Sequence, residues 1–492
     1  MPFWSRSGPE DTSSALRRFD VIFVLPHMGR GGAQRVTSIV ANAWARQGKK
    51  ICILTWDGHE EIAHDLDPRI ERIDMPSFTR ELVFRAGIVR RTEVEIRYYM
   101  REAERWLRPR LPWRRLGRRA RASASSIELV IRYFPDRRPW WSSRPIRRMA
   151  ASAMVFLDRR RKESAFRTVS SIGRASFSRL VLGHRVDAFR EAFLELDSLV
   201  IISLLTKTNL YVLEAVRGMK VRVVISERND PDLQQIDPGL ASLRWLAYRD
   251  AYAVTSNSAG ILEKLSAFVP AEKLKLLPNP VEAPAVADAD GPRGARFVSV
   301  ARLVPQKGID LLLSAFAKIA GEVADWNLEI VGDGPLRDVL MAQAKALGIG
   351  DRVTFHGFVP NPTKLLQSGR VFVLPSRFEG MPNALLEAMA CGLAPIVTDA
   401  SPGPLESVTH NETGLVVPSE NISALAEAMR LLASDDGFAD RLGRQASAYV
   451  TNHDWSVVEP QWLQVLGIDS GNRADELLAQ ATPQLLRGTL ER

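Results

Sequence analysis

Two glutamates and two cations have the types and spacing to bind a phosphorylated sugar. Glu379 and Glu387 have seven residues between them in the segment VFVLPSRFEGMPNALLEAMACG. A carboxylate accepts paired hydrogen bonds, so it suits the vicinal hydroxyl groups of a sugar. Arg302 and Lys307 lie five residues apart in SVARLVPQKGID, and a planar guanidinium together with a mobile ammonium group suits a pyrophosphate. Solvated charges at helix ends or on the surface are the alternative for these residues.

Backbone N–H groups beside these side chains could bind phosphate. Pro382 stands where a helix should begin, because the fixed φ of proline suits the first turn. The N-terminus of such a helix is a natural phosphate site. The N–H groups that would point out of it are those of Gly380, Met381 and Asn383. In the turn VGDGPL, Gly332 permits tight backbone geometry, and we expect Asp333 to cap a helix rather than to contact a ligand.

Two doubly wound α/β domains would position these residues. Continuous apolar runs are typical of parallel strands that are covered on both faces. The strands expected in the first domain are 20–25, 50–55, 199–205, 221–225 and 251–255. Those expected in the second are 296–301, 326–331, 352–355, 371–374 and 394–397. A glycine-rich turn at 29–32 and a helical pattern at 33–47 follow the first strand. Open parallel sheets bind ligands at the carboxyl ends of their strands, so we expect the site in a cleft between the domains.

A stretch rich in Pro, Ala and Gly, VEAPAVADADGPRGA, reads as an interdomain linker. We expect residues 1–280 to form the first domain, with an insertion at about 80–190, and residues 281–454 to form the second. Residues 455–492 would contain a helix at 455–466 that crosses back to the first domain, followed by a tail.

The order of these motifs resembles that of the retaining glycosyltransferases of family 4. The resemblance rests on S-R-F-E-G-x-P before E-A-M-A-C-G, on A-R-L with K-G, on V-G-D-G-P and on P-N-P-V. It covers the second domain from about 297 to 455 and reaches the first through GRGGAQRV. It implies the α/β GT-B fold, in which two Rossmann-like domains face a central cleft that holds a nucleotide-sugar. It also implies that the anomeric configuration is retained.

Family roles fall on the matching positions. Arg302 and Lys307 resemble the residues that bind the donor pyrophosphate and stabilise the departing nucleotide diphosphate. Glu379 resembles the carboxylate at the donor sugar, and Glu387 the one that binds the ribose hydroxyls. The predicted donor-binding set is Gly31, Gly32, Arg302, Lys307, Gly332, Gly380, Met381, Asn383 and Glu387. Gly31 and Gly32 should bring bare backbone close to the phosphates or the acceptor.

The first domain departs from the family pattern at Glu227. Many relatives have a histidine near the donor sugar at the end of a first-domain strand, where VVISERNDP has Glu227. The S-E-R-N-D-P segment resembles a subgroup that transfers hexose or N-acetylhexosamine to polyprenyl-linked oligosaccharides. Glu227, Arg228 and Asn229 are therefore candidates for contact with the acceptor or the donor sugar, and a capping cluster is the alternative. The predicted catalytic set is Glu379, Arg302, Lys307 and Glu227. We expect His27 to be a hydrogen-bonded loop residue rather than a base.

The resemblance also implies that protein charges, rather than a bound metal, stabilise the leaving group. No metal or tightly bound cofactor is therefore expected, and the nucleotide-sugar would be a co-substrate. Two D-x-D sequences exist, Asp65-Leu66-Asp67 and Asp288-Ala289-Asp290, but neither follows a buried strand, and we reject both as metal sites. The two cysteines, Cys52 and Cys391, cannot build a disulfide framework or a thiolate metal site.

Positive charge is concentrated in one segment. The chain has a net charge of +9, but residues 80–190 contain 29 basic and 10 acidic residues, so the rest sums to −10. Arginine clusters alternate with Trp106, Trp113, Trp140 and Trp141, a pattern typical of a helix at an anionic membrane interface. A solvated insertion without a partner is the alternative, and a nucleic-acid surface has no other support. No run of 18 apolar residues exists, and no secretory signal is seen at the N-terminus.

These features predict a transferase that uses a nucleotide-sugar, with UDP as the expected nucleotide. The expected acceptor is a saccharide on a polyprenyl diphosphate, and the enzyme would act at the inner membrane face as a peripheral cytoplasmic protein. A nicotinamide oxidoreductase is one alternative, because G-x-G-G follows the first strand and Asp57 closes the second. A non-catalytic sugar-binding protein is the other, although the intact set of charged residues argues against it.

Overall fold

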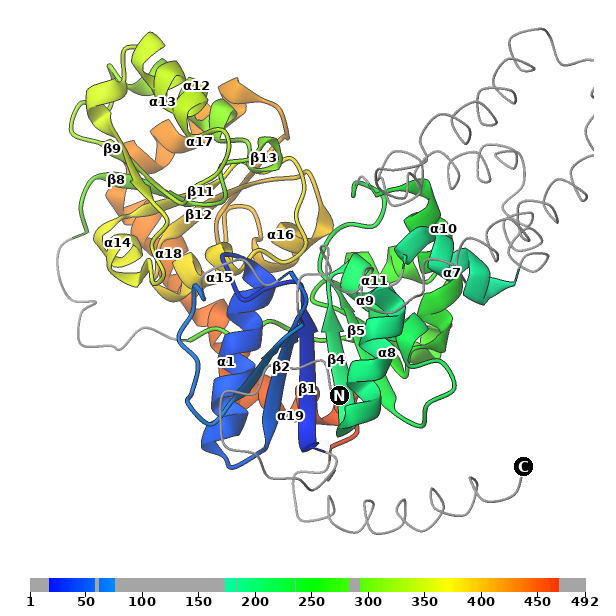
Figure 1. Cartoon of the computed structure of the whole chain (residues 1–492). Coiled ribbons are helices and arrows are strands. Elements are labelled where there is room, and N and C mark those ends of the chain that lie inside the picture. The colour runs from blue at the N-terminus through cyan, green and yellow to red at the C-terminus, as the bar shows by residue number, and fades with distance from the viewer. Residues whose placement is uncertain are drawn as a thin grey trace, which may run out of the picture. The chain divides into compact units, whose positions relative to one another are not determined.

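The computed structural model describes residues 17–57, 62–75, 173–183, 185–234, 236–282 and 293–468 (Figure 1). The chain divides into two compact units, of which the smaller is Pro76–Arg185 with Asp237–Gly239. Within the described residues this smaller unit contributes helix α7 (Arg174–Leu182). Most of the arginine-rich segment 80–190 lies outside the described residues, so its membrane role stays a prediction. The larger unit contains two sheets.

The first sheet, as described, has seven parallel strands in the order β3-β2-β1-β4-β5-β6-β7. The strands are β1 (Arg17–Leu25), β2 (Ile51–Thr55), β3 (Glu71–Asp74), β4 (Leu196–Leu204), β5 (Arg222–Glu227), β6 (Ala253–Ser256) and β7 (Leu274–Leu276). Val21 of β1 lies opposite Ile51 on one side and Val200 on the other. Strands β2 and β3 are added on one side of β1, and the chain then crosses to the other side of β1, where β4 to β7 follow. The topological switch point therefore lies between β1 and β4.

Helices on both faces explain why the central strands contain continuous buried apolar runs, such as residues 21–25 of β1 (Figure 1). They are α1 (Gly32–Arg46), α8 (Arg185–Glu195), α9 (Thr206–Ala215), α10 (Pro238–Ala247) and α11 (Ala259–Leu265). Trp44 of α1 is fully buried, and its ring centroid lies 6.1 Å from that of Phe23 in β1. Burying rings of this size contributes much of the stability of such a core.

The second sheet repeats the plan, with described strands in the order β10-β9-β8-β11-β12-β13, all parallel. They are β8 (Arg296–Val300), β9 (Asn327–Val331), β10 (Val353–Gly357), β11 (Val371–Leu374), β12 (Ala394–Thr398) and β13 (Leu415–Val417). Its helices are α12 (Ile309–Ile319), α13 (Arg337–Ala346), α14 (Thr363–Ser368), α15 (Asn383–Ala390), α16 (Pro402–Ser407), α17 (Ile422–Ser434) and α18 (Asp436–Val450). The switch point lies between β8 and β11. The two doubly wound domains expected from the sequence are confirmed.

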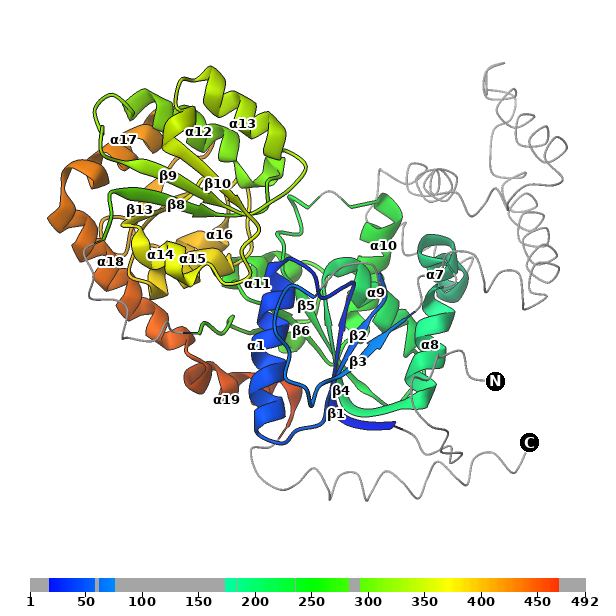
Figure 2. The ribbon, with the colours of Figure 1, turned by 60° about the vertical axis from the view of Figure 1, so that its left-hand side comes forward.

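The last described helix, α19 (Trp455–Leu466), packs against the first sheet's core. Figure 2 shows it beside α1, where the ring centroids of Trp462 and Trp44 are 6.2 Å apart. Trp462 Nε1 donates to the carbonyl oxygen of Pro278 at 3.0 Å. The segment around residue 280 therefore lies beside the chain that returns to α19.

The turn after β9 corrects one expectation. Asp333 does not cap a helix, because α13 begins at Arg337 and Leu336 is its N-cap residue. Asp333 Oδ1 instead accepts a hydrogen bond from the backbone N–H of Gly334 at 2.8 Å. Its Oδ2 lies 3.4 Å from Arg30 Nη1, in the glycine-rich turn after β1.

Candidate functional site

The residues that the sequence singles out follow the carboxyl ends of strands in both sheets. Gly31 and Gly32 follow β1, and Glu227 ends β5. In the second domain, Arg302 and Lys307 follow β8, and the segment from Ser376 to Glu387 follows β11. β1, β8 and β11 flank the two switch points, where open α/β sheets bind ligands.

Lys307 and Glu379 form an ion pair in the second domain. Lys307 Nζ lies 2.5 Å from Glu379 Oε1, and their side chains are 16% and 7% exposed. Ser376 Oγ donates to the same carboxylate oxygen at 2.7 Å, and the Glu379 backbone N–H donates to Ser401 Oγ at 2.8 Å. These contacts therefore hold the Glu379 side chain in position.

A glycine allows this pair to form. Gly308, directly after Lys307, has φ 64°, and a Cβ there would lie 2.0 Å from the carbonyl oxygen of Pro375. Only a residue without a side chain fits this conformation at that distance. The close approach brings the loop after β8 against the loop after β11. Arg302, in the same loop, is exposed, and its side chain forms no hydrogen bond or ion pair with another described residue; its carbonyl oxygen accepts from the backbone N–H of Val304 at 2.9 Å.

The N-terminus of α15 is held by amide side chains from the first domain. Pro382 is the N-cap residue and the helix begins at Asn383, one residue beyond the expected start. Asn257 contacts both backbone groups of Met381: its Oδ1 accepts from the N–H at 3.4 Å, and its Nδ2 donates to the carbonyl at 3.3 Å. The Met381 N–H predicted to bind phosphate is thus already hydrogen-bonded.

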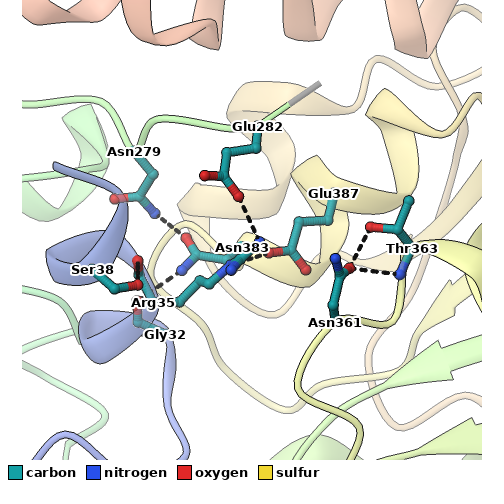
Figure 3. Close-up of polar contacts among 9 residues, drawn as sticks. All are labelled: Gly32, Arg35, Ser38, Asn279, Glu282, Asn361, Thr363, Asn383 and Glu387. Atoms are coloured by element: carbon teal, nitrogen blue, oxygen red, sulfur yellow. Dashed lines mark hydrogen bonds and ion pairs between the residues drawn. The ribbon is translucent and has the colours of Figure 1, made fainter. Parts of the chain in front are cut away.

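Gly32, Asn279 and Asn383 form a short hydrogen-bonded chain (Figure 3). Asn279 Nδ2 donates to Asn383 Oδ1 at 2.6 Å, and Asn383 Nδ2 donates to the Gly32 carbonyl at 2.8 Å. A Cβ on Gly32 would lie 3.2 Å from Asn383 Nδ2, so glycine suits this contact. The first residue of α1 therefore contacts the first residue of α15, so the positive ends of two helix dipoles lie close together.

Arg35, one turn into α1, links Glu387 and Glu282 (Figure 3). Its Nε lies 3.4 Å from Glu387 Oε1, and its Nη2 lies 3.0 Å from Glu282 Oε2. Burial raises the pKa of Glu387, and the Arg35 charge opposes that rise. Arg35 was not among the residues expected at the site, although Arg35 lies in the GRGGAQRV segment.

Glu227 lies inside the first domain, fully buried. Tyr248 OH donates to Glu227 Oε2 at 2.7 Å, and Thr206 Oγ1 lies 2.9 Å from the same oxygen. The backbone N–H of Arg228 donates to Oε1 at 3.2 Å. Burial raises the pKa of Glu227, and the bond from Tyr248 opposes that rise. Direct contact between Glu227 and a substrate stays a prediction, and these bonds favour a positioning role.

The remaining expected residues have local partners. His27 Nδ1 accepts from the Gly29 N–H at 3.1 Å, as a hydrogen-bonded loop histidine would. The Asp67 carboxylate accepts two hydrogen bonds from the Arg69 side chain, at 2.8 and 2.7 Å, and one from the Arg69 backbone N–H at 3.0 Å. Within the described residues no group of three or more His, Cys, Asp or Glu side chains could hold a metal ion. Asp288 and Asp290 lie outside the described residues. Cys52 and Cys391 are both buried thiols without a disulfide.

Comparison with known protein families shows that most of the second domain matches a glycosyltransferase family. Residues 291–449 match the family model described as "Glycosyl transferases group 1". This range contains Arg302, Lys307, Glu379 and Glu387. The resemblance to family 4 glycosyltransferases is confirmed for this domain.

Curated relatives match a larger share of the chain than the family model does. A Campylobacter jejuni N-acetylgalactosamine-N,N'-diacetylbacillosaminyl-diphospho-undecaprenol 4-alpha-N-acetylgalactosaminyltransferase is 31% identical over 44% of this chain and 62% of its own length. A second C. jejuni transferase, which adds N-acetylgalactosamine to GalNAc-alpha-(1->4)-GalNAc-alpha-(1->3)-diNAcBac-PP-undecaprenol, is 28% identical over 57% of this chain and 77% of its own. A Streptomyces coelicolor exopolysaccharide phosphotransferase is 34% identical over 39% of this chain. The chain spans 20% of that protein and less than two thirds of the first C. jejuni enzyme.

Solved structures share the fold. Sucrose-phosphate synthase from Thermosynechococcus elongatus superposes with a TM-score of 0.62 at 18% identity, over 94% of this chain and all of that one. An Anabaena protein solved with UDP and glucose gives a TM-score of 0.59 at 14% identity, over 91% of this chain and 99% of that one. At such identities the likeness concerns the fold alone, and the expected GT-B fold is confirmed.

Proposed function

We propose that this protein is a retaining glycosyltransferase that moves a hexose or N-acetylhexosamine from a UDP-linked donor to a lipid-linked saccharide. The observation that carries the proposal is the Lys307–Glu379 pair beside the N-terminus of α15, with Glu387 on that helix. These residues lie in the domain that matches the glycosyltransferase family. The nicotinamide alternative has no support from the relatives, which are glycosyltransferases and an exopolysaccharide phosphotransferase.

Each charged group has a task in such a transfer. The bond between the anomeric carbon and the β-phosphate oxygen breaks, and its electron pair stays on the departing diphosphate. The acceptor hydroxyl oxygen bonds to that carbon, and the hydroxyl proton passes to an oxygen of the departing diphosphate. Negative charge grows on the departing diphosphate, where Lys307 and Arg302 would stabilise it electrostatically. Glu379 would accept hydrogen bonds from the donor sugar, and Glu387 from the ribose hydroxyls. To bind ribose, Glu387 would exchange its contact with Arg35 for the ligand.

The proposed acceptor is a saccharide on a polyprenyl diphosphate, and the proposed location is the inner face of the cell membrane. The names of the two C. jejuni relatives support the acceptor class. No helix among the described residues is long and apolar enough to cross a membrane. Surface attachment would then depend on the net +19 segment at 80–190, since each basic residue near an anionic bilayer contributes about 1 kcal/mol.

A donor-binding screen tests the chemistry. UDP, GDP and NAD would each be titrated against the protein, and we expect UDP to raise the melting temperature most. Lys307→Ala should abolish most of that rise and most transfer activity. Lys318→Ala is the matched control, because Lys318 is an exposed lysine at the other end of α12 that bonds Ser423 at 2.9 Å. Stabilisation by NAD alone would refute the proposal.

Flotation tests the location separately. Liposomes with about a third anionic lipid should carry the protein upward at low salt and release it at high salt, because the Debye length shrinks from about 10 Å at 0.1 M to 3 Å at 1 M. A chain that lacks residues 80–172 should stay at the bottom. Failure of the intact protein to float at any salt concentration would exclude the surface attachment while leaving the donor chemistry untouched.

A further inference from the structure

Arg228 carries a buried charge that the protein leaves without a counter-ion. It follows Glu227 at the end of β5, and its Nη1 donates to Asn279 Oδ1. Its Nε and Nη2 are buried and have no hydrogen-bond partner among the described residues. Burial lowers the pKa of Arg228 to about 10, so the guanidinium stays protonated at neutral pH. No carboxylate in the described ranges forms an ion pair with it.

The adjacent Glu227 carboxylate does not pair with the Arg228 guanidinium. Glu227 bonds the backbone N–H of Arg228, at 3.2 Å, and its other partners are Thr206 and Tyr248. Asp230, two residues on, is paired with Lys264. The anions closest in sequence are therefore engaged elsewhere.

Arg228 lies next to the place where the donor diphosphate is expected. Asn279, which accepts from Arg228, is the first member of the amide chain that continues to Asn383 and Gly32. A Cβ on Gly380 would lie 2.3 Å from the Arg228 carbonyl oxygen. The loop that precedes α15 therefore packs directly on the Arg228 backbone, and one residue of the first domain lies beside a helix N-terminus of the second.

A buried cation without a partner is costly, and proteins normally pair such a charge or bind an anion with it. We propose that the missing partner is a phosphate oxygen of a diphosphate ester, which the substrate brings to Nε and Nη2 of Arg228. The inference rests on the proposed function and adds a binding residue from the first domain to it. The two unpartnered N–H groups lie on one edge of the guanidinium, and this edge suits bidentate binding of phosphate.

Two diphosphates could supply that oxygen: the nucleotide of the donor and the polyprenyl diphosphate of the acceptor. UDP and farnesyl diphosphate serve as separate probes. Arg228→Met keeps a long, unbranched apolar stem and removes the charged guanidinium. We expect it to raise the Kd of one probe by about 10- to 100-fold, as for the loss of hydrogen bonds to a charged group. A weaker UDP affinity assigns the site to the donor, and a weaker farnesyl diphosphate affinity assigns it to the acceptor.

The melting temperature without ligand separates binding from a structural role. Replacing an unpaired buried charge by an apolar side chain should leave this temperature unchanged or raise it. Arg352→Met is the matched control, because Arg352 is also partly buried but donates to the carbonyls of Ala320 and Trp326, at 2.6 and 3.1 Å. We expect Arg352→Met to melt at a lower temperature and to keep wild-type affinity for both probes. Arg228→Lys, which keeps the charge without the planar edge, should fold and bind with intermediate affinity.

The inference is overturned if Arg228→Met binds both probes with the same affinity as the wild type. It is also overturned if Arg228→Met and Arg228→Lys both melt well below the wild type while their ligand affinities stay unchanged, because Arg228 would then have a structural role. These results would leave the proposed function standing if the wild type binds UDP. A wild-type protein that binds neither probe would contradict the proposed function itself, and the inference with it.

Discussion

The Lys307–Glu379 pair makes a quantitative prediction about stability as well as activity. Glu379 is the more deeply buried partner, with 7% of its side chain exposed against 16% for Lys307. Replacing Lys307 by Met leaves a buried carboxylate whose remaining side-chain partner is Ser376. Replacing Glu379 by Gln keeps an acceptor for Ser376, and the flexible lysine can turn toward water. The two single variants should therefore differ.

The magnitudes follow from burial and distance. Opposite charges about 4 Å apart attract by about 4 kcal/mol at an effective dielectric constant of 20. Breaking a buried pair by removing one partner costs about 3–5 kcal/mol. Because this pair is not fully buried, we expect Lys307→Met to lower the free energy of unfolding by about 3 kcal/mol, at the low end of that range. Glu379→Gln should cost about 1 kcal/mol.

The double variant Lys307→Met/Glu379→Gln is the critical one. It buries no unpaired charge, so its free energy of unfolding should return to within about 1 kcal/mol of the wild type. Urea unfolding followed by circular dichroism measures all four proteins, and Lys318→Met, at an exposed site on α12, should change stability by less than about 0.5 kcal/mol. Additive single effects, without recovery in the double variant, would refute the pairing. All three variants at positions 307 and 379 should lose transfer activity.

Three further predictions concern the surroundings of the site. Ribose binding needs the ionised Glu387 carboxylate, and burial raises the pKa of Glu387 while the Arg35 charge opposes that rise. UDP affinity should therefore fall on acidification. In calorimetric titrations, Arg35→Met should move this loss of affinity to higher pH, because the pKa of Glu387 would rise further. Glu406→Gln weakens bonds from Ser258 Oγ at 2.6 Å and from the N–H groups of Ala259 and Gly260, so unfolding in urea should become easier by about 1–2 kcal/mol, and an unchanged urea midpoint would contradict this contact. Gly308→Ala forces a Cβ to within 2.0 Å of a carbonyl oxygen at positive φ, so we expect a loss of at least about 1–3 kcal/mol, and wild-type stability would exclude this turn.

The long central strands and most helices could be predicted from sequence because apolar runs and helical spacing are local signals. Strands β3, β7 and β13 were not expected, since they are three or four residues long and lie at or near sheet edges. β3 and β7 have exposed or half-buried residues and therefore no continuous apolar run.

The geometry of the candidate site could be predicted from sequence where one motif contains both the residue and its structural support. Glu379, Pro382 and Glu387 belong to one strand, loop and helix, so their spacing reveals them. Arg35 was missed because its partner Glu387 lies 352 residues further along the chain, and no local pattern encodes that contact. The burial of Glu227 was missed for the same reason: Tyr248 and Thr206 come from other elements of the first domain.

Turnover of a nucleotide-sugar tests the central claim most directly. The protein would be incubated with UDP-linked hexoses and N-acetylhexosamines and a polyprenyl-diphosphate-linked saccharide, and proton NMR would follow the released nucleotide and the anomeric signal of the product. We predict release of UDP, a product with the anomeric configuration of the donor, and loss of both signals in Lys307→Met. No nucleotide release from any sugar donor by the folded protein, or a product of inverted configuration, would contradict the account.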